Sequence, residues 1–87
     1  MAVVYLPASL VDLFPGAPRR LHLEAATVRE LLLQLDRSWP GMLDRLCDPG
    51  PAIREHINIF VNGEKADVGT ALDRSAVVRV IPAVSGG

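Results

Sequence analysis

The sequence predicts an α+β domain in which a small mixed sheet covers one main helix. The chain has 87 residues, which is enough for one hydrophobic core but not for two. Its longest segment with helical apolar spacing, residues 27–39, is preceded and followed by segments rich in β-branched residues. Strands on both sides of one amphipathic helix are typical of a sheet packed against that helix.

The first two elements are expected to be strands. Residues 2–7 are β-branched, aromatic or apolar and stop at a proline. Residues 19–24 alternate polar and apolar side chains, which is typical of a half-buried strand. The turn-forming residues Pro15, Gly16 and Pro18 lie between the two segments. The two strands are therefore predicted to form a hairpin.

A capping box predicts the start of the main helix. Thr27 and Glu30 have the required spacing, in which Thr27 accepts from the Glu30 amide and Glu30 reaches back to the Thr27 amide. Apolar residues then recur at helical spacing, namely Val28, Leu31, Leu32, Leu35 and Trp39. Pro40 and Gly41 end this helix, and residues 42–47 are expected to form a short second helix.

The second half of the chain predicts three more strands. Residues 57–61 form the strongest strand pattern, and Asn62-Gly63 after them is typical of a type I′ hairpin turn. Residues 64–67 are expected to form a short edge strand. Residues 69–75 are expected to form a connector with one helical turn, and residues 76–82 the last strand.

Composition argues against several classes of function. Charged residues make up 22% of the chain and the net charge is −1, which does not favour nucleic-acid binding. No apolar stretch approaches the roughly 20 residues that cross a bilayer. Cys47 is the only cysteine and is expected to be a small half-buried apolar residue, which suits a reducing, cytoplasmic location. His22 and His56 lack metal-ligand spacing, so no metal site is expected.

The C-terminus holds the best candidate for a reacting group, the α-carboxylate of Gly87. Such a carboxylate is ionised at neutral pH and is a poor electrophile, so its reaction with a nucleophile requires activation by an ATP-using partner. Residues 1–82 are expected to be the folded domain and residues 83–87 a flexible tail. Because Pro82 has no amide hydrogen, strand pairing is expected to weaken there and release the tail. Five extended residues reach roughly 16 Å.

Two segments resemble those of the ubiquitin-like sulfur carriers. They are residues 58–64, Asn-Ile-Phe-Val-Asn-Gly-Glu, and residues 78–87, which end in Pro82-Ala83-Val84-Ser85-Gly86-Gly87. This family includes the small subunit of molybdopterin synthase, the thiamine-pathway sulfur carrier and the carriers of cysteine biosynthesis. The ending and residues 45–49 are most similar to the cysteine-biosynthesis carriers. The resemblance covers nearly the whole chain and implies a β-grasp fold.

The resemblance also implies a role for the tail. Gly87 would be adenylated by an E1-like activating enzyme and converted to a thiocarboxylate, which then donates sulfur to a biosynthetic acceptor enzyme. Gly86 would fit a narrow channel of the activating enzyme, and Ser85 and Val84 would belong to the same tail. The protein would be a cosubstrate rather than an enzyme. ATP and magnesium would be bound by the partner, and this chain would hold no cofactor.

Strand alternation predicts a docking surface beside the tail. Val78 and Val80 share one face of the last strand, whereas Val77, Arg79 and Ile81 share the other. If the first pair faces the helix, an exposed apolar patch remains. Its expected members are Phe60, Ile81, Val77 and Tyr5, with Arg79 as a polar rim contact. The activating and acceptor enzymes are expected to dock there; the alternative is ordinary scattered surface apolarity.

Other functions for the same tail stay open at this point. A permanent synthase subunit, such as the small subunit of molybdopterin synthase, would keep its tail docked in a catalytic partner. A ubiquitin-like modifier would form isopeptide bonds between Gly87 and lysines. An interaction domain with an inert tail is the simplest alternative. Residue patterns alone do not name the acceptor pathway.

Overall fold

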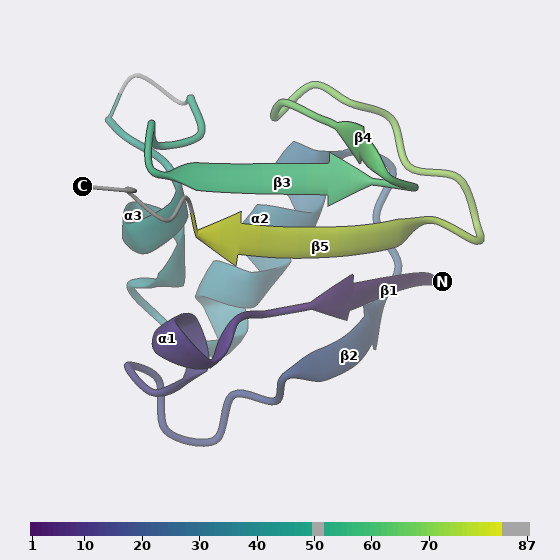
Figure 1. Cartoon of the computed structure of the whole chain (residues 1–87). Helices are drawn as coiled ribbons and strands as arrows, with labels where there is room; N and C mark the ends of the chain where they lie inside the picture. Colours follow the sequence, from purple (N-terminus) through teal and green to yellow (C-terminus); the bar gives the residue numbers. More distant parts are fainter. Residues whose placement is uncertain (50–51, 83–87) are drawn as a thin grey trace.

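The computed structural model describes residues 1–49 and 52–82 and contains five strands and three helices within them. The strands are β1 (Ala2–Tyr5), β2 (Arg20–Leu23), β3 (Ile57–Val61), β4 (Glu64–Lys65) and β5 (Val77–Pro82). The helices are α1 (Ala8–Val11), α2 (Val28–Ser38) and α3 (Met42–Leu46). The strands form one mixed sheet in the order β2-β1-β5-β3-β4, and α2 crosses behind it in Figure 1. The predicted α+β class is confirmed.

The central strand of this sheet is β5. It pairs parallel with β1 and antiparallel with β3, so the N-terminal and C-terminal ends of the chain share the middle of the sheet. β1 and β2 are antiparallel neighbours, as the predicted hairpin requires. Asn62 and Gly63 join β3 to β4 with φ angles of 52° and 85°, and positive φ at both positions is what a type I′ turn needs.

The hydrophobic core lies between α2 and the inner face of the sheet. Four of the five apolar residues predicted to face the core from α2 are buried. The fifth, Trp39, is the C-cap residue of the helix and is half-buried. Side chains of β5 alternate between the two faces, because Val78 and Val80 are buried while Arg79 and Ile81 are exposed. The inner face of β5 therefore belongs to the core, and its outer face is free.

Two predicted loop regions differ from the structure. Helix α1 was not predicted from the sequence. It follows Pro7 and is held by hydrogen bonds from the Leu10 and Val11 amides to the Pro7 carbonyl, at 3.0 and 3.1 Å. A helix of four residues is too short to show a periodicity. The connector 69–75 contains no helical turn. Ala71 instead forms a β-bridge with Thr27, and a turn lies on each side of this bridge.

The start of α2 departs from the predicted capping box in one bond. The Glu30 amide donates to Thr27 Oγ1 at 3.2 Å, as predicted. The Glu30 carboxylate, however, accepts from the Ala26 amide at 2.8 Å and not from the Thr27 amide. Thr27 is the bridge partner of Ala71, which ties this residue to the connector. The carboxylate binds one residue earlier than in a capping box, and the hydrogen bonds of the bridge use the Ala26 carbonyl and the Val28 amide rather than the Thr27 amide.

Pro82 is the last residue of β5, so the strand ends at the residue where pairing was expected to weaken. Pro82 stands in register with Ile57 on β3. The Ala76 carbonyl accepts from Val3 on β1, and the Val77 carbonyl accepts from Asn62 on the β3 side. By strand alternation, the missing N–H of Pro82 then faces the β1 side, where pairing with β1 stops at Arg79. The proline costs the sheet no hydrogen bond.

Several predicted boundaries were one or two residues too long. Strands predicted over residues 2–7, 19–24, 64–67 and 76–82 are Ala2–Tyr5, Arg20–Leu23, Glu64–Lys65 and Val77–Pro82 in the structure. The predicted domain limit after residue 82 stays a prediction, because residues 83–87 lie outside the described part of the chain.

Candidate functional site

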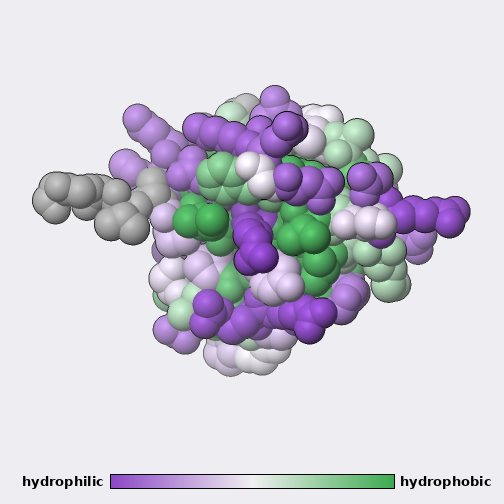
Figure 2. Space-filling model, turned by 45° about the vertical axis from the view of Figure 1, so that its right-hand side comes forward, coloured by the Kyte–Doolittle hydropathy of each residue, from purple (hydrophilic) through white to green (hydrophobic). Residues whose placement is uncertain are grey.

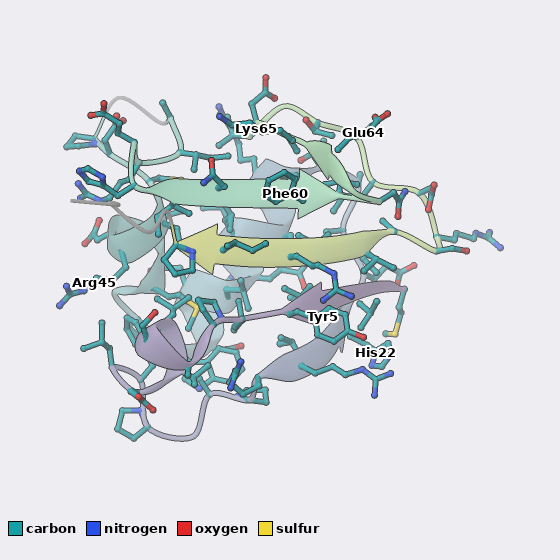
Figure 3. All side chains as sticks on the ribbon, viewed as in Figure 1. Tyr5, His22, Arg45, Phe60, Glu64 and Lys65 are labelled. Carbon is teal, nitrogen blue, oxygen red and sulfur yellow. The ribbon has the colours of Figure 1, made fainter. Side chains whose placement is uncertain are left out.

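The structure gathers five predicted docking residues on the sheet face opposite α2. We call Tyr5, Phe60, Val77, Arg79 and Ile81 the outer-face patch. Tyr5, Phe60 and Val77 are half-buried, Arg79 is exposed, and Ile81 has an exposed fraction of 43%. Figure 3 shows the labelled Tyr5 and Phe60 on either side of β5. The patch thus combines residues of β1, β3 and β5.

Arg79 lies in the middle of this patch rather than at its rim. The register places Tyr5 opposite Arg79 across the β1–β5 pair, and Phe60 opposite Arg79 across the β3–β5 pair. The guanidinium carbon of Arg79 is 4.4 Å from the centroid of the Tyr5 ring, which is cation–π geometry. This contact orients the guanidinium over the tyrosine ring.

A groove of about 430 Å³ adjoins the patch where β1 stops and β5 continues. Its lining includes Tyr5, Arg19, Arg20, Arg79, Ile81 and Pro82. The groove therefore extends from Tyr5 in the patch to Pro82 at the end of β5. Figure 2 shows hydrophobic side chains gathered on a face that hydrophilic side chains surround.

The predicted reactive tail begins beside this groove. Val84, Ser85, Gly86 and Gly87 lie outside the described residues. Pro82 is the last residue of β5 and lines the groove, and Ile81 of the patch directly precedes it. The structure therefore places the root of the tail at one end of the outer-face patch, on the same strand.

Cys47 lies outside this site and is buried more deeply than expected. Its exposed fraction is 8%, whereas a half-buried residue was predicted from the sequence. Burial raises the pKa of the Cys47 thiol, the charge of Asp48 raises it further, and Arg54 and Arg29 oppose the shift. A thiol with a raised pKa holds little thiolate at neutral pH, and the thiolate is the nucleophilic form.

The remaining candidates for other kinds of site are isolated. His22 and His56 are both exposed. Among residues 1–49 and 52–82, no group of three or more His, Cys, Asp or Glu side chains is placed to hold a metal ion. Within the same ranges, every helix is too short or too polar to span a bilayer.

The fold and the exit of the chain beside an exposed sheet face define a ubiquitin-like β-grasp protein. The ThiS family model matches residues 4–87, which include the terminal diglycine. The chain belongs to the ThiS family of ubiquitin-like sulfur carriers and modifiers. Members of this group are small carrier proteins that act with E1-like activating enzymes and acceptor partners. The resemblance found in the sequence is confirmed at this level.

Solved structures confirm the β-grasp fold. The chain is similar to a chain of the BexX/CysO complex of Amycolatopsis orientalis, with a TM-score of 0.86, 22% identity and full coverage of both chains. CysO of Mycobacterium tuberculosis gives a TM-score of 0.86 at 24% identity, covering 97% of this chain and 100% of that one. SAMP1 of Haloferax volcanii gives 0.80 at 28% identity, covering 99% and 98%. A search of curated protein sequences gave no match.

Proposed function

We propose that this protein is a sulfur carrier whose Gly87 carboxylate is activated and thiocarboxylated by an E1-like enzyme. The observation that carries the proposal is the family match through Gly87, because it includes the terminal diglycine and not only the folded domain. The placement of Pro82 beside the outer-face patch supports it, since a partner that binds the patch also meets the root of the tail.

The proposed chemistry takes place on the Gly87 carboxylate in two steps. A carboxylate oxygen attacks the α-phosphorus of magnesium-bound ATP held by the partner, and pyrophosphate leaves. Hydrosulfide from a sulfur donor then attacks the acyl carbon, and AMP leaves with the electron pair of the broken C–O bond. The thiocarboxylic acid that forms loses its proton at neutral pH. The sulfur is then available to an acceptor enzyme.

The outer-face patch is the docking surface in this proposal. Ile81 and Phe60 supply apolar contact area, and the half-buried Tyr5 supplies an aromatic ring with a polar end. Docking through a sheet face leaves the tail free to enter the partner, because the tail follows β5 directly. The chain itself contributes the acyl group and the recognition surface, and the partner contributes catalysis.

A cysteine-type acceptor pathway is the favoured destination of the sulfur. This choice rests on the ending Pro82-Ala83-Val84-Ser85-Gly86-Gly87 and on residues 45–49, which resemble the cysteine-biosynthesis carriers. One observation favours a second function. The similar structures at 26–28% identity include SAMP1 chains, and SAMP1 is named a small archaeal modifier protein. A modifier would use the same adenylate and then bond Gly87 to a lysine amine.

Intact mass spectrometry separates these functions. The protein is incubated with ATP, magnesium, an E1-like enzyme from the same genome and sulfide. We expect a mass increase equal to the exchange of one oxygen for sulfur. Omission of ATP is the control and should abolish the increase. Covalent ladders on target proteins would instead show a modifier, and an unchanged mass in every reaction would contradict activation of Gly87.

A further inference from the structure

The outer face carries a row of alternating cations and aromatic rings, one residue from each strand. The register pairs Arg20 with Tyr5, Tyr5 with Arg79, Arg79 with Phe60 and Phe60 with Lys65. We call these five residues the cross-strand row. Paired residues on neighbouring strands share a face of the sheet, so all five side chains lie on the outer face. Figure 3 shows Tyr5, Phe60 and Lys65 in this order across the sheet.

The cross-strand row concentrates positive charge on a chain that is slightly acidic overall. It contains three cationic side chains, whereas the whole chain has a net charge of −1. Arg19 adds a fourth cation in the adjoining groove, and none of the described residues that line the groove is acidic. Glu64 does not offset this charge, because its partner Val61 is buried on the inner face.

The cations of the row are available to bind a partner. Within the described part of the chain, Arg20 and Lys65 make no side-chain hydrogen bond or ion pair, and the interaction found for Arg79 is its contact with the Tyr5 ring. A guanidinium that stacks on an aromatic ring makes this contact through its face, which leaves its N–H groups able to donate to other partners. This arrangement suits bidentate hydrogen bonds to a carboxylate.

The spacing of the row defines the complementary surface. Neighbouring strands lie about 4.8 Å apart, so the Cα atoms of successive cationic residues in the row are separated by about 10 Å. The Arg79 guanidinium lies over the Tyr5 ring, which places its charge on the β1 side of the row. A matching surface presents carboxylates to these cations and an apolar side chain between Arg79 and Lys65. The carboxylates would meet Arg20, Arg79 and Lys65, and the apolar side chains would contact Tyr5 and Phe60.

We propose that the activating enzyme docks on the cross-strand row through an acidic surface segment of this pattern, which guides the adjoining tail toward its active site. The inference rests on the proposed function and adds the chemistry of the partner. Charge complementarity of this kind raises association rates and sets the orientation of the complex. A protein surface fits better than nucleic acid, because the row holds only three cations and the chain is acidic overall.

The test measures binding of the full-length protein to its E1-like enzyme by biolayer interferometry at several salt concentrations. Arg20→Gln and Arg79→Gln remove one positive charge each from the row. Arg37→Gln is the matched control, since Arg37 is exposed in the last turn of α2 and lies outside the row. Melting temperatures confirm that the variants are folded. Arg79→Lys keeps the charge but loses bidentate geometry.

We expect Arg20→Gln and Arg79→Gln each to raise Kd about tenfold, mainly through a slower association rate. Both variants should also make Kd depend less strongly on the salt concentration. Arg79→Lys should lose less than Arg79→Gln, and Arg37→Gln should change Kd by less than about twofold. Arg37→Gln should also keep the wild-type rate of adenylation. Equal losses in Arg37→Gln and the row variants would show a general charge effect and overturn the proposal.

Two further outcomes separate this inference from the proposed function. Normal adenylation of the wild-type protein, with a Kd that the row variants leave unchanged, would overturn the docking inference alone. Binding that depends on the row but leads to no adenylate would overturn the proposed function alone. A short single-stranded RNA is included as a competitor, and displacement of the enzyme by this RNA would overturn the choice of a protein partner.

Discussion

Two adjacent residues of β5 allow core packing and partner docking to be separated. Val80 has an exposed fraction of 3%, and Ile81 has one of 43% on the opposite face. Val80→Ala removes two buried carbon groups worth about 0.8 kcal/mol each, and the cavity left behind raises the expected loss to about 2–3 kcal/mol. Ile81→Ala removes a largely solvated side chain, so we expect it to lower the free energy of unfolding by about 1 kcal/mol or less.

Urea unfolding followed by far-UV circular dichroism measures both losses. In a domain of this size each kcal/mol corresponds to about 4–8 °C in melting temperature, so Val80→Ala should melt at least about 8 °C below the wild type. Affinity for the activating enzyme should show the reverse order, with Ile81→Ala binding weakly and folded Val80→Ala binding normally. Equal stability losses in the two variants would refute the assignment of Ile81 to a free outer face.

Four other variants test the tail, the buried thiol and the helix cap. Gly86→Ala and deletion of Gly87 should keep the wild-type melting temperature but abolish thiocarboxylation in the mass assay, and a normally activated Gly87 deletion would contradict the proposed function. The folded Cys47 thiol, with its raised pKa, keeps its proton where the unfolded thiol loses it, so its contribution to stability should fall as the pH rises above 9.0. Urea titrations of the wild type and Cys47→Ala at increasing pH measure this contribution. If the free energies of unfolding of the two proteins fall in parallel as the pH rises, the prediction is contradicted. Thr27→Ala removes the acceptor of the Glu30 amide and should cost about 1 kcal/mol in the same urea assay, whereas an unchanged midpoint would show that the bond adds nothing.

Local patterns predicted the elements that carry the core. The helical spacing of α2 and the two-residue alternation of β5 are properties of contiguous residues, and each has one buried face in the structure. The Asn62-Gly63 turn was predictable for the same reason, because positive φ at two successive positions strongly restricts the residues that fit. Such features are encoded in the segments that form them.

Features that depend on distant partners were not predictable in the same way. The Ala71–Thr27 bridge joins residues far apart in the sequence, and it stands where a helical turn of the connector was predicted. The behaviour of Pro82 depends on where pairing with β1 stops, which residues 76–82 do not encode. Each of these features depends on sheet register, which is set by the assembled core.

The candidate site contains features of both kinds, some encoded in a single strand and some that depend on the register between strands. Alternation along β3 and β5 was enough to assign Phe60 and Ile81 to the outer face. The position of Arg79 between Tyr5 and Phe60 required the parallel register of β1 with β5. The recognition of Arg20 as a neighbour of Tyr5 required the antiparallel register of β1 with β2. The sequence signal for Arg20 was present in the alternation of β2, but without the strand order it indicated only a solvated side chain.

The position of the patch on β5 limits which enzymes can use this protein. Ile81 belongs to the patch, and Gly87 follows it after six residues, which span at most about 20 Å when fully extended. In the proposed function, the docking surface and the Gly87 carboxylate therefore cannot be farther apart than this distance in a productive complex. An activating enzyme must hold its adenylation site within about 20 Å of the surface that contacts Ile81. Because β5 is the central strand and its inner face is packed in the core, the anchor point of the tail is held by the whole sheet.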